Sequence, residues 1–273
     1  MIKVKVYAKV NITLLINGME NGYHMLDSVV ASADIADVIS ANESSKDSVN
    51  LSSGDTCLAN KILRLIDAMR KDRSFPFVCI NIENNIPLGG GLGGSSADLA
   101  GVIVALNVLF DLGYNEDELV KIADSVGSDT AFMLRGGCAK IVGRSTVTDR
   151  FVMKERECVI AIKGFCDTAK VFAIYDAQPS KCKCDNASVI SALKEGVDHG
   201  VCEPNDLLPA SEKINPDVRV ALDILGKGAS MSGSGSSVFL FDTDPHKIHR
   251  LRSLGYNVFV TRIGNFCTDV IKN

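Results

Sequence analysis

A glycine cluster that runs straight into an apolar segment is the feature that most constrains this fold. Residues 87–101 read PLGGGLGGSSADLAG. Glycines let backbone N–H groups approach a ligand because no Cβ intervenes. We expect Ser95 or Ser96 to cap the following helix, whose first-turn N–H groups and dipole favour an anion. The pattern predicts a phosphate-binding loop; the alternative is a glycine-rich turn ahead of a core helix.

The segment after the loop predicts a buried helix. Residues 97–109 read ADLAGVIVALNVL, in which Asp98 and Asn107 are the only polar side chains. A helix that is apolar on nearly all faces is buried, and this one is too short and too interrupted to span a membrane. Its N-terminus would therefore face a glycine-lined opening.

Two familiar phosphate loops fit this cluster poorly. The Gly-Lys-Ser/Thr of the Walker loop is absent, so no lysine reaches the outer phosphates. Gly89, Gly91 and Gly94 satisfy G-x-G-x-x-G, but a dinucleotide site needs an acidic residue at the end of the next strand. Asp111 lies in a turn after the helix instead.

Composition excludes several classes of partner. The net charge is −4 and Lys and Arg are scattered, so neither a nucleic-acid footprint nor a membrane-surface patch is expected. The first residues, MIKVKVYAKV, contain no apolar signal segment. Nine cysteines without a CxxC motif indicate reduced thiols and a cytoplasmic protein. Cys182, Cys184, His199 and Cys202 form a loose zinc candidate; the alternative is that these cysteines act as small hydrophobic residues.

Mixed strand and helix patterns predict an α/β (α+β) fold. We expect a domain boundary near Arg150, after the turn-prone GRSTVTDR, which gives domains of 1–150 and 151–273. Strands are expected at 2–16, 77–82, 158–162, 237–241 and 257–262, and helices at 60–70, 96–109, 186–195, 217–225 and 246–254.

The first strand places Lys9 and Asn11 on one face, opposite Val4, Val6, Ala8, Val10 and Ile12. The plain interpretation of that polar face is a half-solvated edge strand. Asp129, in VGSDTAFML, has a similarly plain role as the N-cap of a short helix.

Two further segments leave alternatives open. Asn21-Gly22 is a hairpin signal, and Tyr23 and His24 follow it, where Tyr23 would be core and His24 solvated unless they bind a ligand. A second glycine cluster, MSGSGSS at 231–237, is either a flexible connector or a second backbone wall for a ligand.

Together the motifs resemble the GHMP kinase superfamily, in the family's order: YAKVNITL, PLGGGLGGSSA and MSGSGSSVFLF. Within it, NGYHMLDSVV, GSDTAFMLRGG, DTAKVFAIYD and the PND at 204–206 are similar to the branch that phosphorylates cytidine diphosphate methylerythritol. The resemblance implies a two-domain fold with the active site in the interdomain cleft, and ATP with Mg²⁺ as cofactors. The alternatives are a GHMP kinase for another small alcohol, such as homoserine or mevalonate, and an inactive protein of this fold that only binds a ligand.

The resemblance also implies roles for single residues. Lys9 and Asp129 match the catalytic pair, and no side chain is assigned to a metal. Asn11, Tyr23, His24, Thr168 and Phe172 match the substrate site, with the aromatic rings stacking on cytosine. The residues implied to bind ATP are Asn60 near adenine and, at the phosphates, Pro87, Leu88, Gly89, Gly90, Gly91, Leu92, Gly93, Gly94, Ser95, Ser96 and Ala97. The chain departs from the family pattern at Asn21, Ser95, Ala97 and Ala131, where the family usually has Asp, Gly, Ser and Pro.

Overall fold

The computed structural model describes residues 1–144, 146–198 and 204–271, and its strands join in one sheet. The strands of the described chain are β1 (Ile2–Asn11), β2 (Leu15–Glu20), β3 (Tyr23–Glu43), β4 (Ser48–Leu51), β5 (Val78–Glu83), β6 (Cys138–Gly143), β7 (Thr146–Phe151), β8 (Arg156–Ile162), β9 (Ser230–Met231), β10 (Val238–Leu240), β11 (Asn257–Gly264) and β12 (Asp269–Ile271). The helices are α1 (Thr56–Asp72), α2 (Gly94–Leu109), α3 (Glu116–Val126), α4 (Thr130–Met133), α5 (Thr168–Ala177), α6 (Asn186–Glu195), α7 (Leu208–Ile214), α8 (Asp217–Leu225) and α9 (Pro245–Ser253). This confirms the α/β class.

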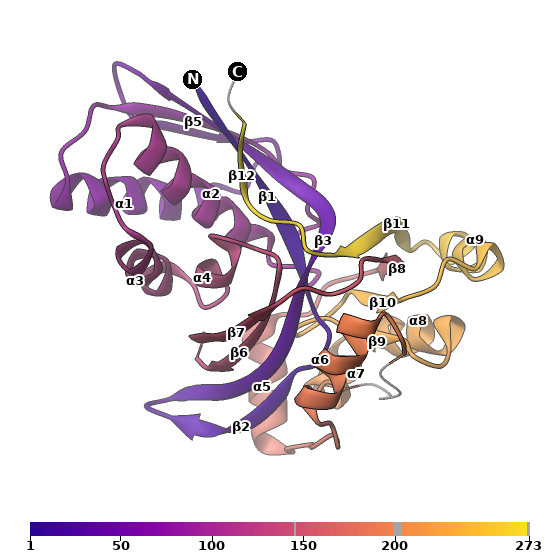
Figure 1. Cartoon of the computed structure of the whole chain (residues 1–273). Helices are drawn as coiled ribbons and strands as arrows, with labels where there is room; N and C mark the ends of the chain where they lie inside the picture. The colour runs from indigo at the N-terminus through magenta and orange to yellow at the C-terminus, as the bar shows by residue number, and fades with distance from the viewer. Residues whose placement is uncertain (145, 199–203, 272–273) are drawn as a thin grey trace.

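The sheet runs in the order β12-β1-β3-β11-β8-β10-β9, and β3 is its hub because β2, β5 and β6 also pair with it. Helices α1 to α4 gather to the left of the long strands β1 and β3 in Figure 1, whereas α8 and α9 lie to the right of them. Strand β11 pairs with β3 and β12 pairs with β1, so the second half of the chain completes a sheet begun by the first. The expected division near Arg150 stays a prediction.

Strand β1 is an interior strand, and its burial follows its alternating sequence. Val4, Val6, Ala8 and Val10 are fully buried. The opposite face is also covered near its end, where Lys9 and Asn11 are each 4% exposed. The interpretation as a half-solvated edge strand is therefore wrong, because β12 and β3 flank β1 and the rest of the site covers its polar face.

The Asn21-Gly22 hairpin is confirmed. Both residues have positive φ, 50° and 77°, and they join β2 to β3, where Glu20 pairs with Tyr23. A turn of this hand matches the right-handed twist of the flanking strands. The single strand expected over 2–16 is interrupted, because residues 12–14 separate β1 from β2.

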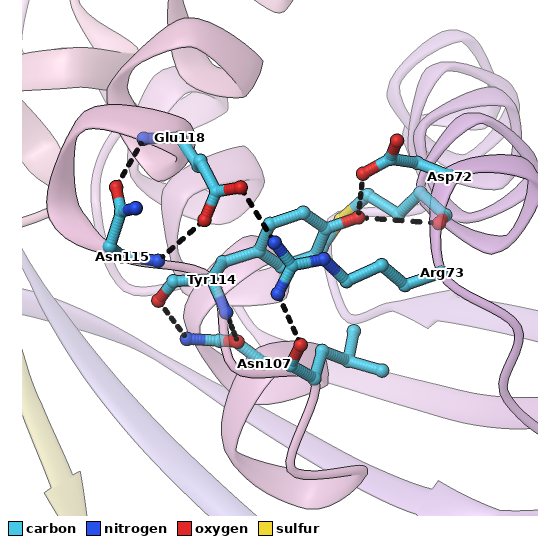
Figure 2. A network of polar contacts seen from close by, with 8 residues as sticks. Asp72, Arg73, Asn107, Tyr114, Asn115 and Glu118 are labelled. Carbon is cyan, nitrogen blue, oxygen red and sulfur yellow. Dashed lines mark hydrogen bonds and ion pairs between the residues drawn. The ribbon is translucent and has the colours of Figure 1, made fainter.

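A polar network fixes the distal end of α2 (Figure 2). Asn107, near the C-terminal end of this helix, accepts from the backbone N–H of Tyr114 at 3.1 Å and donates to its carbonyl. The Tyr114 hydroxyl donates to Asp72 at the end of α1, and burial raises the pKa of Tyr114 to about 12. Arg73 lies over the Tyr114 ring and pairs with Glu118, which forms a capping box with Asn115. Helices α1, α2 and α3 are thereby locked together, with the N-terminus of α2 at the glycine loop.

Candidate active site

A cavity of about 270 Å³ lies where the two halves of the chain meet. We call residues 87–94 the glycine loop and residues 231–237 the second glycine loop. The first half contributes β1, the glycine loop and the start of α4 to the cavity wall. The second half contributes α5, Leu207 and part of the second glycine loop. The cavity thus gathers segments that are far apart in the sequence.

Lys9 and Asp129 meet at this cavity. Lys9 Nζ lies 2.5 Å from Asn11 Oδ1 and 3.2 Å from Asp129 Oδ2. Both lysine partners are acceptors, so the buried ammonium is compensated. The alternation of β1 puts Lys9 and Asn11 on one face, as predicted.

Asp129 stands at the N-cap position of α4, but among the described residues its side chain makes no capping bond. The carboxylate instead turns to Lys9, and its side chain is 37% exposed. The alternative interpretation, in which the Asp129 side chain caps α4, therefore does not describe this structure. A carboxylate that is open to a cavity and paired with a buried lysine suits general-base chemistry.

Asn11 is held from three directions. Its amide nitrogen donates to Ser28 Oγ at 2.8 Å, and its backbone N–H donates to Ser232 Oγ at 3.1 Å. Its side-chain oxygen accepts from Lys9. These bonds leave Asn11 one orientation, with its oxygen toward the ammonium, which settles the position of the Lys9 side chain.

The glycine loop is tied to β1 by its backbone, because the Lys9 N–H donates to the Leu92 carbonyl at 2.9 Å. Helix α2 begins at Gly94, after Gly93 with φ of 79°, and no side chain of the described residues caps it. The expectation that Ser95 or Ser96 caps the helix is wrong. The left-handed turn at Gly93 starts the helix early, so both serines lie within its first turn. Both line the cavity.

The two glycine loops pack backbone against backbone. Ser232 Oγ donates to the Gly91 carbonyl at 3.1 Å, and the Ser237 N–H donates to the Gly90 carbonyl at 3.1 Å. A Cβ added to Gly91 would lie 2.3 Å from the Ser232 carbonyl oxygen. Gly233 and Ser234 reach the cavity, so the second loop is a wall rather than a free connector.

The second wall is itself anchored by the PND segment. The Asn205 amide nitrogen donates to the carbonyls of Met231 and Gly233, both at 2.9 Å. Asp206 accepts from the Ile16 N–H at 2.9 Å. The segment therefore links β2 to the second glycine loop.

Aromatic residues gather beside the cavity on α5 and β3. Thr168 and Phe172 line it, and the His24 ring stacks on Phe172 with centroids 4.4 Å apart. His24 Nε2 lies 2.7 Å from Asp176 Oδ1. Tyr23 is 49% exposed, and Arg144 lies over its ring. The structure thus brings Phe172 and His24 together as predicted, while Tyr23 lies farther out.

Most of the predicted site residues line the cavity, and four do not: Tyr23, His24, Asn60 and Ala97. All residues of the glycine loop line it, as do Lys9, Asn11, Asp129, Thr168 and Phe172. Asn60 lies exposed on α1 and Ala97 is fully buried in α2, and neither lines this cavity. Their assignment to ATP stays a prediction.

Sequence reasoning missed several lining residues: Leu14, Leu26, Ser128 and Leu207. Leu207 directly follows the PND motif, and Ser128 directly precedes Asp129. Their position next to these motifs is the sequence signal that could have found them. Leu14 and Leu26 sit in β-rich stretches that offer no such signal.

The structure describes two of the four residues of the zinc candidate, Cys182 and Cys184. Burial, followed by the adjacent Asp206, raises the pKa of Cys182 to about 12. Its Sγ donates to Asp206 Oδ1 at 3.0 Å. His199 and Cys202 lie outside the described residues. Within the described residues, no group of three or more His, Cys, Asp or Glu side chains is placed to hold a metal.

Comparison with known proteins places this geometry in a family. Residues 60–137 match the model of the GHMP kinases N terminal domain. A protein of Caldanaerobacter subterraneus subsp. tengcongensis, named 4-diphosphocytidyl-2-C-methyl-D-erythritol kinase, is 33% identical over 273 residues, covering 91% of both chains. A protein of the same name from Desulfitobacterium hafniense is 33% identical, with 93% of each covered.

The chain belongs to the 4-diphosphocytidyl-2-C-methyl-D-erythritol kinase family.

A solved structure agrees with this family. The crystal structure of a 4-(cytidine 5'-diphospho)-2C-methyl-D-erythritol kinase superposes with a TM-score of 0.78 at 26% identity, covering 97% of this chain and all of that one. A homoserine kinase from Cytophaga hutchinsonii, at 19% identity and a TM-score of 0.68, shares the fold. The superposition on the first of these kinase structures therefore covers nearly the whole chain. None of the helices in the described part of the chain is long and apolar enough to cross a bilayer.

Proposed function

We propose that this chain transfers the γ-phosphoryl group of ATP to the tertiary 2-hydroxyl of 4-diphosphocytidyl-2-C-methyl-D-erythritol, in non-mevalonate isoprenoid precursor biosynthesis. The observation that carries the proposal is the Lys9–Asp129 pair, 3.2 Å apart, at a cavity bounded by the glycine loop. The choice of substrate follows from the names of the related kinases.

The pair has the chemistry that the transfer needs. Asp129 accepts the proton of the substrate hydroxyl while the hydroxyl oxygen forms its bond to the γ-phosphorus. The bond from that phosphorus to the β–γ bridging oxygen breaks, and ADP leaves. Lys9 orients Asp129 and, as a buried cation fixed by Asn11, stabilises the negative charge that develops on the transferred group.

The glycine loop fits the triphosphate. Its backbone borders the cavity, and α2 presents an N-terminus there that no described side chain caps. Such an N-terminus favours phosphate. Mg²⁺ bound with ATP would be held by the phosphate oxygens, where it neutralises charge. Asp129, the acidic residue that lines the cavity, is paired with Lys9 instead.

The α5 side of the cavity fits the cytidine end of the substrate. Phe172 offers an aromatic face at the cavity wall, and His24 lies against it. A planar base stacks on such a ring, and the imidazole supplies hydrogen bonds to its edge. The substrate is thereby held at one end by its base and at the other by Asn11 and Asp129.

An ADP-release assay with a panel of alcohols tests this function. The panel contains 4-diphosphocytidyl-2-C-methyl-D-erythritol, homoserine and mevalonate, each with ATP and Mg²⁺. We expect turnover with the cytidyl compound to exceed the others by more than about a hundredfold. Preference for homoserine or mevalonate would assign that alcohol as the substrate instead. No turnover with any of the three would indicate a protein that only binds ligands.

A further inference from the structure

Two buried carboxyl groups meet beneath the glycine loop. Asp37, on β3, is 1% exposed, and Asp98, on α2, is fully buried. The Asn84 amide nitrogen reaches both, at 2.8 Å from Asp98 Oδ2 and 3.5 Å from Asp37 Oδ2. Neither carboxyl lines the cavity or takes part in the chemistry above.

Asp37 holds the residues that lead into the glycine loop. Its Oδ1 accepts the backbone N–H of Asn85 at 2.5 Å and that of Ile86 at 2.8 Å, directly before Pro87. Asp98 lies in α2, which starts where the loop ends. Asp37 therefore holds the start of the glycine loop, and Asp98 lies just after its end. A hydrogen bond between the two carboxyl groups would connect both ends of the loop.

The hydrogen bonding is incomplete if both groups are ionised. Asp98 Oδ1 is buried, and no other described residue supplies a partner for it. In the described chain the charged groups that act on Asp98 are Asp37 and Asp55, the N-cap of α1, and both are acids. Two carboxylates without a cation between them repel strongly in a dry site. One proton on Asp98 removes a charge and provides the missing donor.

We propose that Asp98 is protonated at neutral pH, shares its proton with Asp37, and through this bond positions the glycine loop for nucleotide binding. The pair acts as a positioning element, and its effect on binding rests on the proposed role of the loop. The environment of the pair supports the assignment: burial, followed by the charge of Asp37, raises the pKa of Asp98 to about 9. Burial also raises the pKa of Asp37, against the lowering effect of the Ile86 and Asn85 N–H groups.

The proton is tested directly by infrared spectroscopy. The difference spectrum between wild type and Asp98→Asn at about pH 7.5 should contain the C=O stretch of one protonated carboxyl, which fades as the pH rises past about 9. Asp37→Asn should also lack the band, because an amide donor at position 37 lets Asp98 ionise. Circular dichroism checks that both variants are folded. Absence of the band in wild type overturns the proposal.

The positioning role is tested by calorimetric titration with ATP. Asp98→Asn keeps a neutral donor, so its ATP affinity at about pH 7.5 should stay within about threefold of wild type. Raising the pH to about 10 should weaken wild-type binding about tenfold more than that of Asp98→Asn, since other titrating groups are common to both. Parallel pH profiles would overturn the positioning role. If wild type does not bind ATP at any pH, the nucleotide role of the loop is wrong, and the infrared band still decides whether the proton is shared.

Discussion

The Ser232 hydroxyl, in the second glycine loop, donates a hydrogen bond to the Gly91 carbonyl of the first loop at 3.1 Å. The same hydroxyl oxygen accepts the backbone N–H of Asn11, so one buried serine connects both loops to the strand that carries Lys9. Gly90 and Gly91, where an added Cβ would meet Ser237 and Ser232, are therefore needed for close contact with the second loop.

Gly91→Ala should weaken ATP binding by about tenfold or more. The new Cβ would lie 2.3 Å from the Ser232 carbonyl oxygen, and Gly91 has φ of 75°, which a side chain strains. The matched control is Gly94→Ala, whose Cβ meets Ile86 at an ordinary 3.4 Å without positive φ. Calorimetry with ATP compares the two folded variants. Equal affinities would contradict the packing role of Gly91.

Asp129→Asn should reduce kcat by about a hundredfold or more while leaving the ATP dissociation constant nearly unchanged. The amide keeps an oxygen for Lys9 at 3.2 Å but cannot take the substrate proton. General-base assistance contributes about 10²–10⁴-fold. The carboxylate caps no helix, but it is the charged partner of buried Lys9, so circular dichroism must first show that the variant is folded. Turnover within about threefold of wild type would refute the base assignment.

Phe172→Ala should raise KM for the cytidyl substrate by about tenfold and leave KM for ATP nearly fixed. Phe172 lines the cavity and stacks on His24, and a lost base stack costs about 1–3 kcal/mol. Steady-state kinetics with each substrate varied in turn gives both constants. Some fall in kcat is compatible, because remote binding energy also orients the reacting hydroxyl. An unchanged cytidyl KM would place the base elsewhere.

Asp98→Asn should gain stability relative to wild type as the pH rises from about 5 to about 9. The folded-state pKa of Asp98, about 9, lies above its ordinary value of 3.8, so folded wild type keeps a proton that the unfolded chain releases. The free energy of unfolding of wild type therefore falls across this window, by up to about 1.4 kcal/mol per pH unit. Urea denaturation at several pH values measures the difference. A constant difference would show that Asp98 is ionised when folded.

Local patterns predicted much of the framework. The helices over 186–195 and 217–225 match α6 and α8, and the strand pattern of β1 places Lys9 beside Asn11. These succeed because a strong alternation, or an apolar periodicity with clear ends, leaves one local solution. The meeting of Lys9 with Asp129 followed only from resemblance, because no local rule brings residues 120 positions apart within reach.

The longest strand escaped prediction. β3 spans Tyr23–Glu43 and is rich in Ala, Ser and Asp, which gives neither a strong alternation nor a turn signal. Its conformation is fixed by neighbours that the sequence does not reveal. Likewise, the helix start at Gly94 depends on the left-handed backbone of Gly93, which packs close to Met133 and Lys9.

The position of β3 at the centre of the sheet also governs how the chain folds. It pairs with β1, β2 and β5, and with β6 and β11, so its ladders join residues from position 2 to position 264. Sheets built from such distant pairings fold slowly, because the chain loses the entropy of loop closure before the stabilising strand contacts form. During synthesis, the β3 edge at Ser32 and Ala33 lacks its β11 partner until about residue 264 has been made. An unpaired strand edge is a site where another chain can pair, so the last ladder of this sheet to form also protects the nascent chain.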